Sequence, residues 1–333
     1  MKGLGPRERC TFQFVIRNGN PEVLIPMRIA AVDLVSSTCF PALAAEELGF
    51  YKAEGLDVQI ELFPQLRGAA ALKEGKVDAM MAGSVYDLLT PFPQWAGVKL
   101  LVALSHGTPW LLVVRADLPA ERGDLGVLKG LRIAAAHGPD LAFKKLLIDA
   151  DIDIAREEIQ IVYPAGSEGA KVSFGVFAAE ALKVSEIDGF WANAMGAETA
   201  VRAGAGKILL DVRRGDGPPE ARHYTFAALA TTDEFLTRDP VAAAAAVRAI
   251  VKTQKALRAD PALALKVGER RFPPEAAPLI AAIVEQDLPF YQPAVLEEDV
   301  GRLNGFAQSM GILSRPVPYE QVVAVRFRGL WAS

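Results

Sequence analysis

The sequence contains few residues of the kinds that bind metals or form disulfides. Its 333 residues include two cysteines, Cys10 and Cys39, and three histidines, His106, His137 and His223. Two cysteines make neither a disulfide framework nor a zinc site. The histidines also lack the i, i+4 spacing of a helical metal site. We therefore expect no metal and no other cofactor.

Long basic runs and long apolar runs are also missing. The formal net charge is −4, and no cluster of Lys and Arg predicts a nucleic-acid partner. No stretch reaches the roughly 18 unbroken apolar residues that predict a transmembrane segment. The strongest candidate, residues 98–114, is interrupted by His106, Gly107 and Pro109.

The first 26 residues contain no apolar run of the about 7–15 residues found in secretory signals. We expect residues 1–26 to form an N-terminal tail, because the first clear strand begins at Met27. Motifs of known enzymes are missing as well. No Ser/His/Asp order, glycine-rich nucleotide fingerprint or paired-carboxylate motif stands out.

What the sequence does contain is one pattern written twice. "MRIAAVD" begins at Met27 and "LRIAAAH" at Leu131, and each precedes a polar loop, a helix, a strand, a second helix and a third strand. The short apolar strands and intervening helices give the order βαβαβ. This order predicts an α/β fold of two doubly wound βαβ lobes. A hydrophobic content of 51% is enough for two such cores.

The boundaries of the lobes follow from this repeat. We expect lobe I to be discontinuous, with residues 27–115 and 225–333, and lobe II to cover residues 120–220. The apolar segment "TFAALATT" would return the chain to lobe I, and Asp239 followed by Pro240 predicts the start of a helix. Two crossings between the lobes make a two-stranded hinge, which is suited to closing on a ligand.

In such sheets, ligands bind beyond the carboxyl ends of the strands. Polar or small residues follow the predicted strands in both lobes, and we expect them to face one cleft. Lobe I would contribute hydroxyl groups and backbone amides near a helix start, and an aromatic and an imidazole ring near the first crossing. Lobe II would contribute the matching loops. The candidates are Ser36, Ser37, Thr38, Gly83, Ser84, His106 and Trp110 from lobe I, and His137, Gly138, Ser167, Trp191 and Asn193 from lobe II.

Cys39 lies within the same set of loops, directly before a predicted helix. A cysteine at a helix N-terminus can have a lowered pKa and act as a nucleophile. Cys39 is therefore a candidate ligand contact and, in an alternative interpretation, a catalytic residue. A small packed thiol is the simpler interpretation.

The stretch "AAEELGFYKAEGLDVQIELFP", followed by "ALKEGKVDAMMAG", resembles periplasmic solute-binding proteins of the nitrate, sulfonate and taurine type. It is equally similar to the related thiamine-pyrimidine-precursor family. The resemblance covers about residues 27–310 and implies the type 2 periplasmic-binding fold. In relatives, the ends of the third strands touch the ligand, which supports Ser84, Trp191 and Asn193. The cysteine-rich motif of the thiamine-pyrimidine synthases is not found here.

The resemblance implies a protein that closes on a small anionic or aromatic, heterocyclic ligand and delivers it to the permease of an ABC-type transporter. An alternative is a cytoplasmic enzyme on the same fold, either a Cys39-dependent desulfinase or a decarboxylase-like enzyme. A cytoplasmic ligand sensor is a third interpretation. The family is periplasmic, whereas a chain that starts at the given residue without a signal would be cytoplasmic.

Overall fold

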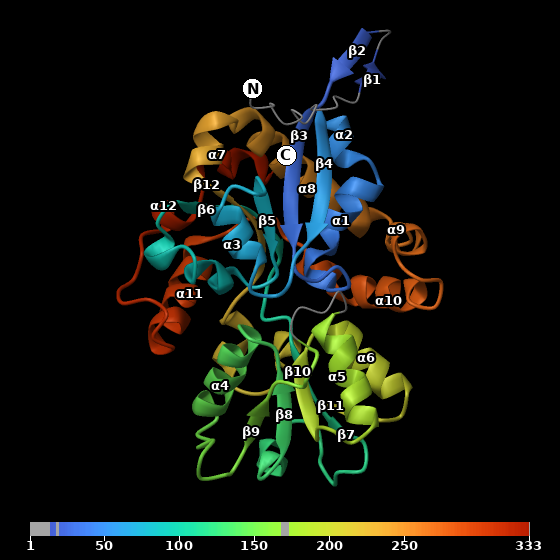
Figure 1. Cartoon of the computed structure of the whole chain (residues 1–333), viewed down its shortest axis with the longest axis vertical. Coiled ribbons are helices and arrows are strands. Elements are labelled where there is room, and N and C mark those ends of the chain that lie inside the picture. The colour runs from blue at the N-terminus through green and yellow to red at the C-terminus, as the bar shows by residue number, and fades with distance from the viewer. Residues whose placement is uncertain (1–13, 18–19, 168–172, 333) are drawn as a thin grey trace, which may run out of the picture.

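A computed structural model describes residues 14–17, 20–167 and 173–332. Two lobes, each built on a five-stranded sheet, lie one above the other (Figure 1). The fold class predicted from the repeat is therefore confirmed. Within the described residues, no helix combines the length and apolar character needed to cross a membrane.

The sheet of lobe I has the order β4-β3-β5-β12-β6. Its first three strands along the chain are parallel, as the βαβαβ pattern predicts: β3 pairs with both β4 and β5. The returning strand β12 enters antiparallel between β5 and β6, so the complete sheet is mixed. The strands are β3 (Ile25–Ala31), β4 (Leu56–Leu62), β5 (Ala79–Ala82), β6 (Val98–Ser105) and β12 (Ala227–Thr232).

Helices surround this sheet, with α3 against β3 and β5 and α8 against β4 and β6. The predicted start of α8 is confirmed, since Asp239 accepts a hydrogen bond of 2.9 Å from the amide of Ala242 and Pro240 is the first helical residue. The helices of lobe I are α1 (Phe40–Glu47), α2 (Phe50–Ala53), α3 (Gly68–Lys73), α7 (Asp233–Arg238), α8 (Pro240–Ala259), α9 (Leu263–Arg271), α10 (Ala277–Asp287), α11 (Glu297–Ser309) and α12 (Tyr319–Val322).

Lobe II repeats the arrangement with the strand order β11-β7-β10-β8-β9. Here β8 is parallel to β9 and β10, while β7 is antiparallel to β10 and β11. The strands are β7 (Leu111–Arg115), β8 (Arg132–Ala135), β9 (Gln160–Val162), β10 (Gly189–Ala192) and β11 (Gly206–Asp211), and the helices are α4 (Pro139–Asp149), α5 (Phe174–Lys183) and α6 (Ala194–Arg202).

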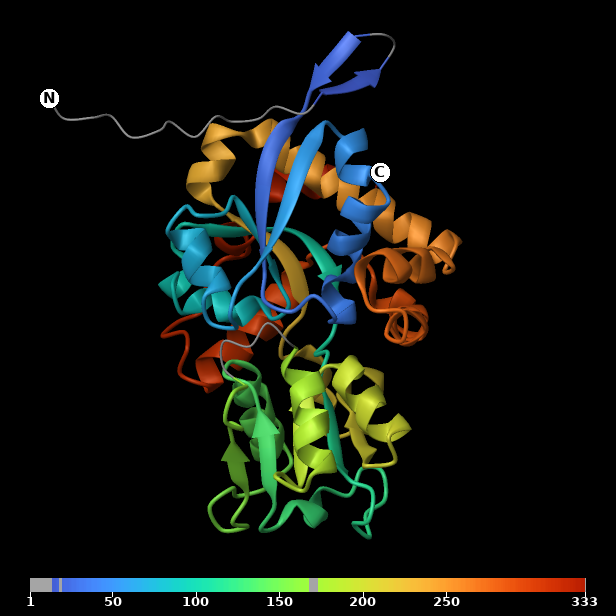
Figure 2. The same cartoon turned by 45° about the vertical axis from the view of Figure 1, so that its right-hand side comes forward.

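Two boundaries differ from the expectation. Residues 111–115, expected in lobe I, form β7, which pairs with β10 and β11 of lobe II. The chain therefore leaves lobe I before Leu111. At the other end, β3 begins at Ile25, which pairs with Leu56, so the expected tail ends two residues earlier. Before it, β1 (Phe14–Arg17) and β2 (Asn20–Val23) form an antiparallel pair that extends away from lobe I (Figure 2).

The lobes are joined by two segments. The first crossover, residues 106–110, connects β6 to β7, and the second, residues 212–226, connects β11 to β12. The second contains two short 3₁₀ turns, η5 (Val212–Arg214) and η6 (Pro219–His223). Further 3₁₀ turns are η1 (Ser37–Cys39), η2 (Val85–Leu89), η3 (Pro93–Trp95), η4 (Leu125–Leu128), η7 (Leu288–Phe290) and η8 (Val325–Leu330).

Candidate functional site

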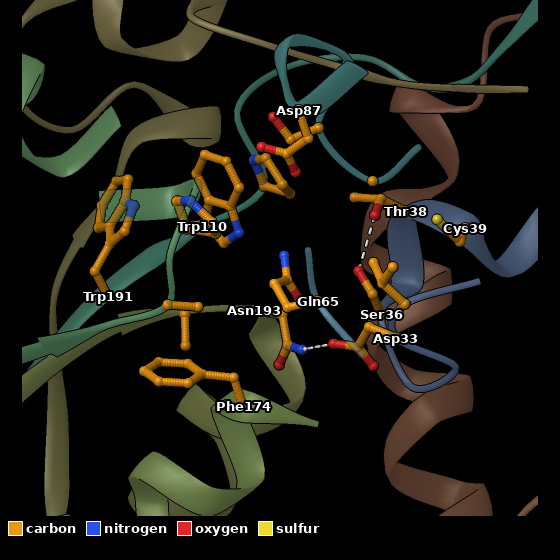
Figure 3. Close-up of a pocket in the computed structure, with 18 residues that line it drawn as sticks. Asp33, Ser36, Thr38, Cys39, Gln65, Asp87, Trp110, Phe174, Trp191 and Asn193 are labelled. Carbon is orange, nitrogen blue, oxygen red and sulfur yellow. Dashed lines mark hydrogen bonds between the residues drawn. The ribbon is translucent and has the colours of Figure 1, made fainter. Parts of the chain in front are cut away.

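A pocket lies between the lobes, where the loops that follow β3 and β5 meet those that follow β8 and β10 (Figure 3). We call it the interlobe pocket; its volume is about 60 Å³. Known pockets for drug-sized ligands measure roughly 300–1,000 Å³. The small volume fits a state in which the lobes have closed on each other. Eight predicted residues line the pocket: Ser36, Thr38, Cys39, Gly83, Ser84, Trp110, Trp191 and Asn193.

The structure adds polar and aromatic residues that the sequence analysis missed. Asp33, Gln65, Asp87 and Phe174 line the pocket and were not candidates. The sequence gives a reason to include two of them, because Asp33 and Asp87 belong to the same two loops as the predicted hydroxyl groups.

Three predicted residues face other parts of the protein. Ser37 points into lobe I, where its hydroxyl group donates a hydrogen bond of 2.6 Å to Asp287. The His106 ring contacts the carbonyl oxygen of Ala294 at 2.9 Å and does not line the pocket. Ser167 lies in the turn after β9 and does not line the pocket. These three positions are corrected: the structure does not bring them to the interlobe pocket.

His137 and Gly138 lie near the pocket without lining it. The His137 ring stacks on the ring of Tyr163 with a centroid distance of 3.8 Å. Gly138 instead takes part in the contact between the lobes. Its carbonyl oxygen accepts a hydrogen bond of 2.9 Å from the hydroxyl group of Tyr86.

Asp33 forms the main polar contact across the pocket. Its Oδ2 accepts hydrogen bonds from Asn193 at 2.7 Å and from Ser173 at 2.9 Å, both in lobe II. Its Oδ1 accepts one from the amide of Val35 at 2.9 Å. Burial raises the pKa of Asp33, and these hydrogen bonds offset part of the rise. The carboxylate therefore holds the two lobes together in the closed form.

Asp87 has a different environment, although it lines the same pocket. Its carboxylate has no hydrogen bond or ion pair among the described residues. Burial, together with the charge of nearby Asp140, raises its pKa to about 7. A partly buried carboxylate without a donor is costly, because it loses water and gains no partner. Asp87 is thus the carboxylate of the pocket that lacks a partner in the described part of the chain, in contrast to Asp33.

Aromatic rings form the lobe II side of the pocket (Figure 3). The rings of Trp110 and Trp191 have centroids 6.1 Å apart at 51°, a tilted pair of the usual geometry. Tyr86 continues this set from lobe I, 6.4 Å from Trp110. The indole Nε1 of Trp191 is buried and has no hydrogen-bond partner in the part of the chain that the structure describes.

Cys39 lies at the start of α1 and is only 4% exposed. Its Sγ is 4.0 Å from the carbonyl oxygen of Met81. Burial, followed by the negative charge of Asp33, raises the thiol pKa to about 12. The sulfur is therefore protonated at neutral pH, which is the opposite of the thiolate that a nucleophile requires.

The composition of the pocket restricts its chemistry. Two carboxylates line it, and the described lining contains no Lys, Arg or His. Over the residues that the structure describes, no group of three or more His, Cys, Asp and Glu side chains is placed to hold a metal ion. The pocket therefore offers hydrogen-bond acceptors and aromatic faces, without a fixed positive charge.

Solved structures with the same fold include binding proteins and an enzyme. The sulfonate-binding protein SsuA of a sulfonate ABC transporter from Methylobacillus flagellatus KT has a TM-score of 0.65 and 19% identity, covering 92% of this chain and 97% of its own. The periplasmic nitrate-binding protein NrtA from Synechocystis PCC 6803 has a TM-score of 0.65 and 13% identity, covering 93% and 88%. The desulfurization enzyme DSZB has a TM-score of 0.62 and 15% identity, covering 92% and 98%. At these identities the likeness shows the fold alone.

Comparison of the sequence with protein families identifies the family of this chain, which the shared fold does not. No curated protein sequence matches the chain. The profile of the family described as NMT1/THI5 like matches residues 37–264, which is more than half of the chain and includes the pocket-lining residues from Thr38 to Asn193. The chain therefore belongs to the NMT1/THI5-like family.

Proposed function

We propose that this protein is the solute-binding component of an ABC-type importer and closes its two lobes on a small ligand in the interlobe pocket. The family and the fold of the transporter-associated neighbours support this role. The two crossovers support it as well, since they allow one lobe to rotate against the other. The permease would be the partner that receives the ligand.

The ligand, in this proposal, is a small aromatic heterocycle that carries N–H donors and is neutral or positively charged. The observation that carries this choice is the unpartnered Asp87 carboxylate in a pocket without Lys, Arg or His among its described lining. An N–H donor on the ligand would give Asp87 the partner that it lacks. The rings of Trp110 and Trp191 suit a flat ligand.

A sulfonate or nitrate ion would meet two carboxylates and no cation in this pocket. An anion placed next to carboxylates in a binding pocket costs several kcal/mol of binding free energy, because like charges repel. Of the two ligand classes expected from the sequence, the aromatic class is therefore favoured over the anionic one.

The Cys39 enzyme is the weaker alternative, because a buried thiol with a pKa of about 12 is a poor nucleophile.

The experiment is native mass spectrometry of the purified protein, followed by a titration that uses tryptophan fluorescence. We expect a co-purified small molecule, and we expect an aminopyrimidine to change the fluorescence more than methanesulfonate does. Asp87→Asn should weaken the aminopyrimidine by about tenfold or more. Tight binding of methanesulfonate, with none of the aminopyrimidine, would contradict the ligand class while leaving the transport role intact.

A further inference from the structure

A second cavity, of about 200 Å³, lies at the joint between the lobes, and we call it the hinge cavity. The first crossover contributes His106 and Gly107 to its wall, the second contributes Arg213 and Arg222, and α11 contributes Arg302. It shares no lining residue with the interlobe pocket. It is therefore a separate space that touches both segments joining the lobes.

The wall of the hinge cavity carries an excess of positive charge. Three arginines line it, and Asp299 is the one carboxylate in its described lining. Arg213 forms an ion pair with Asp287 at 3.0 Å, outside the lining. Arg302 also forms an ion pair outside the lining, with Glu298 on α11. Arg222 is then the arginine of this wall that has no ion pair among the described residues. Burial, followed by the charges of Arg302 and Arg222, lowers the pKa of the neighbouring His223, as a positive field would.

Arg213 is the buried anchor of this wall, with a side chain only 4% exposed. Its Nη2 donates to the carbonyl oxygen of Gly107 at 3.3 Å, which ties the second crossover to the first. Its Nε has no hydrogen-bond partner among the described residues. This nitrogen lies close to Gly107, whose φ is +77°. A Cβ added to Gly107 would lie 3.6 Å from the Nε of Arg213. The buried guanidinium thus keeps one donor unused beside the cavity.

We propose that the hinge cavity binds a small tetrahedral oxyanion, namely a phosphoryl group that is either free or part of a phosphate monoester. Guanidinium groups are well suited to the oxygens of such an anion. Bound there, the anion would contact both crossovers and α11 at once, and so restrain rotation of the lobes.

A larger neighbouring cavity, of about 470 Å³, shares His223 and Arg302 with the hinge cavity. Tyr224 and Phe306 line it with aromatic faces, next to Glu220 and to Lys145, which pairs with Asp149. The organic part of a phosphate monoester would find space and apolar contact there. Tighter binding of an aromatic monoester than of inorganic phosphate would identify the monoester as the better ligand, whereas equal or weaker binding would identify the free ion.

Isothermal titration calorimetry of the full chain at constant ionic strength tests this proposal, with inorganic phosphate and phenyl phosphate as probes and chloride as the background anion. The double variant Arg222→Gln/Arg302→Gln removes two guanidinium groups and leaves the buried Arg213–Asp287 pair intact. The matched control is Arg202→Gln, which removes an arginine from α6, away from the cavity. Arg202 pairs with Glu198 one turn before it, and Arg302 pairs in the same way with Glu298 on α11.

We expect wild-type protein to bind at least one probe at millimolar concentration or below. The double variant should bind it about tenfold or more weakly, and the control should stay within about twofold of wild type. No binding by wild type, or binding that survives the double substitution, would overturn the proposal. The second result would mean that the anion binds elsewhere, including the interlobe pocket.

Discussion

The side-chain amide of Asn193 donates a hydrogen bond of 2.7 Å to Oδ2 of Asp33 and so joins lobe II to lobe I. Its Oδ1 also accepts a hydrogen bond from the amide of Gly196 and caps α6. The same side chain therefore stabilises one lobe and holds it against the other. These two roles can be separated by substitution.

Asn193→Asp keeps an N-cap oxygen but places a second carboxylate against Asp33. We expect the lobes to separate at neutral pH, because like charges in direct contact cost several kcal/mol. Small-angle X-ray scattering should give a larger radius of gyration, while circular dichroism should show unchanged helix content. At acidic pH the two carboxylates can share a proton, and the compact form should return. An unchanged radius of gyration at neutral pH would contradict this role for the contact.

The pKa of Asp87 predicts a pH dependence of stability. Its folded-state pKa, about 7, lies above the ordinary 3.8, so the folded protein holds this proton more tightly than the unfolded chain. The resulting stability is fully present below about pH 4 and is lost as the pH rises through about 7. The upper limit of this effect is about 4 kcal/mol in the free energy of unfolding.

Asp87→Asn provides the matched comparison, since an amide of the same size does not titrate. Between about pH 5 and about pH 8, wild type should lose stability relative to the variant in urea unfolding. Parallel pH profiles for the two proteins would show that Asp87 does not titrate in this range.

The buried thiol of Cys39 should be chemically inert in the native protein. In a Cys10→Ala background, we expect a disulfide reagent to leave Cys39 unmodified at neutral pH and to react fully after unfolding, because its pKa is about 12. Cys39→Ala should change ligand affinity by less than about tenfold, or about 1.4 kcal/mol. Rapid modification of native protein, or loss of a measured turnover in the variant, would favour the enzyme.

Gly138 is placed where a side chain would push the lobes apart. Its φ is +95°, and a Cβ there would lie 2.7 Å from Oδ1 of Asp87 in the opposite lobe. Gly138→Ala should destabilise the closed form beyond the cost of the backbone strain. Gly130→Ala is the control, since Gly130 has a φ of +72° with no atom within 4 Å of the added Cβ.

The control should lose about 1 kcal/mol of stability from strain alone. Gly138→Ala should lose about 1–3 kcal/mol more, because close contacts of this kind force a shift of the structure. It should also increase the radius of gyration. Equal losses in thermal unfolding, with no change in compactness, would mean that the Asp87 carboxylate moves aside easily.

Local sequence determined the elements and the repeat. The apolar run "IAA" follows Arg28 in one lobe and Arg132 in the other, and both copies are buried strands, because strands covered on two faces need consecutive apolar residues. Asp239 and Pro240 specified the start of α8 through a cap and a fixed φ. The carboxyl ends of the strands then placed most candidate loops on one pocket.

Strand pairing and the direction of individual side chains were decided by tertiary structure. The apolar runs at 98–105 and 111–115 look alike in sequence, but the second one pairs with β10 and β11 and so lies inside the sheet of lobe II. In the 3₁₀ turn at 37–39, neighbouring side chains point about 120° apart. Ser37 therefore faces Asp287 inside lobe I, whereas Thr38 and Cys39 line the pocket. The pairing of Asp33 with Asn193 joins residues 160 positions apart, a distance that no local pattern spans.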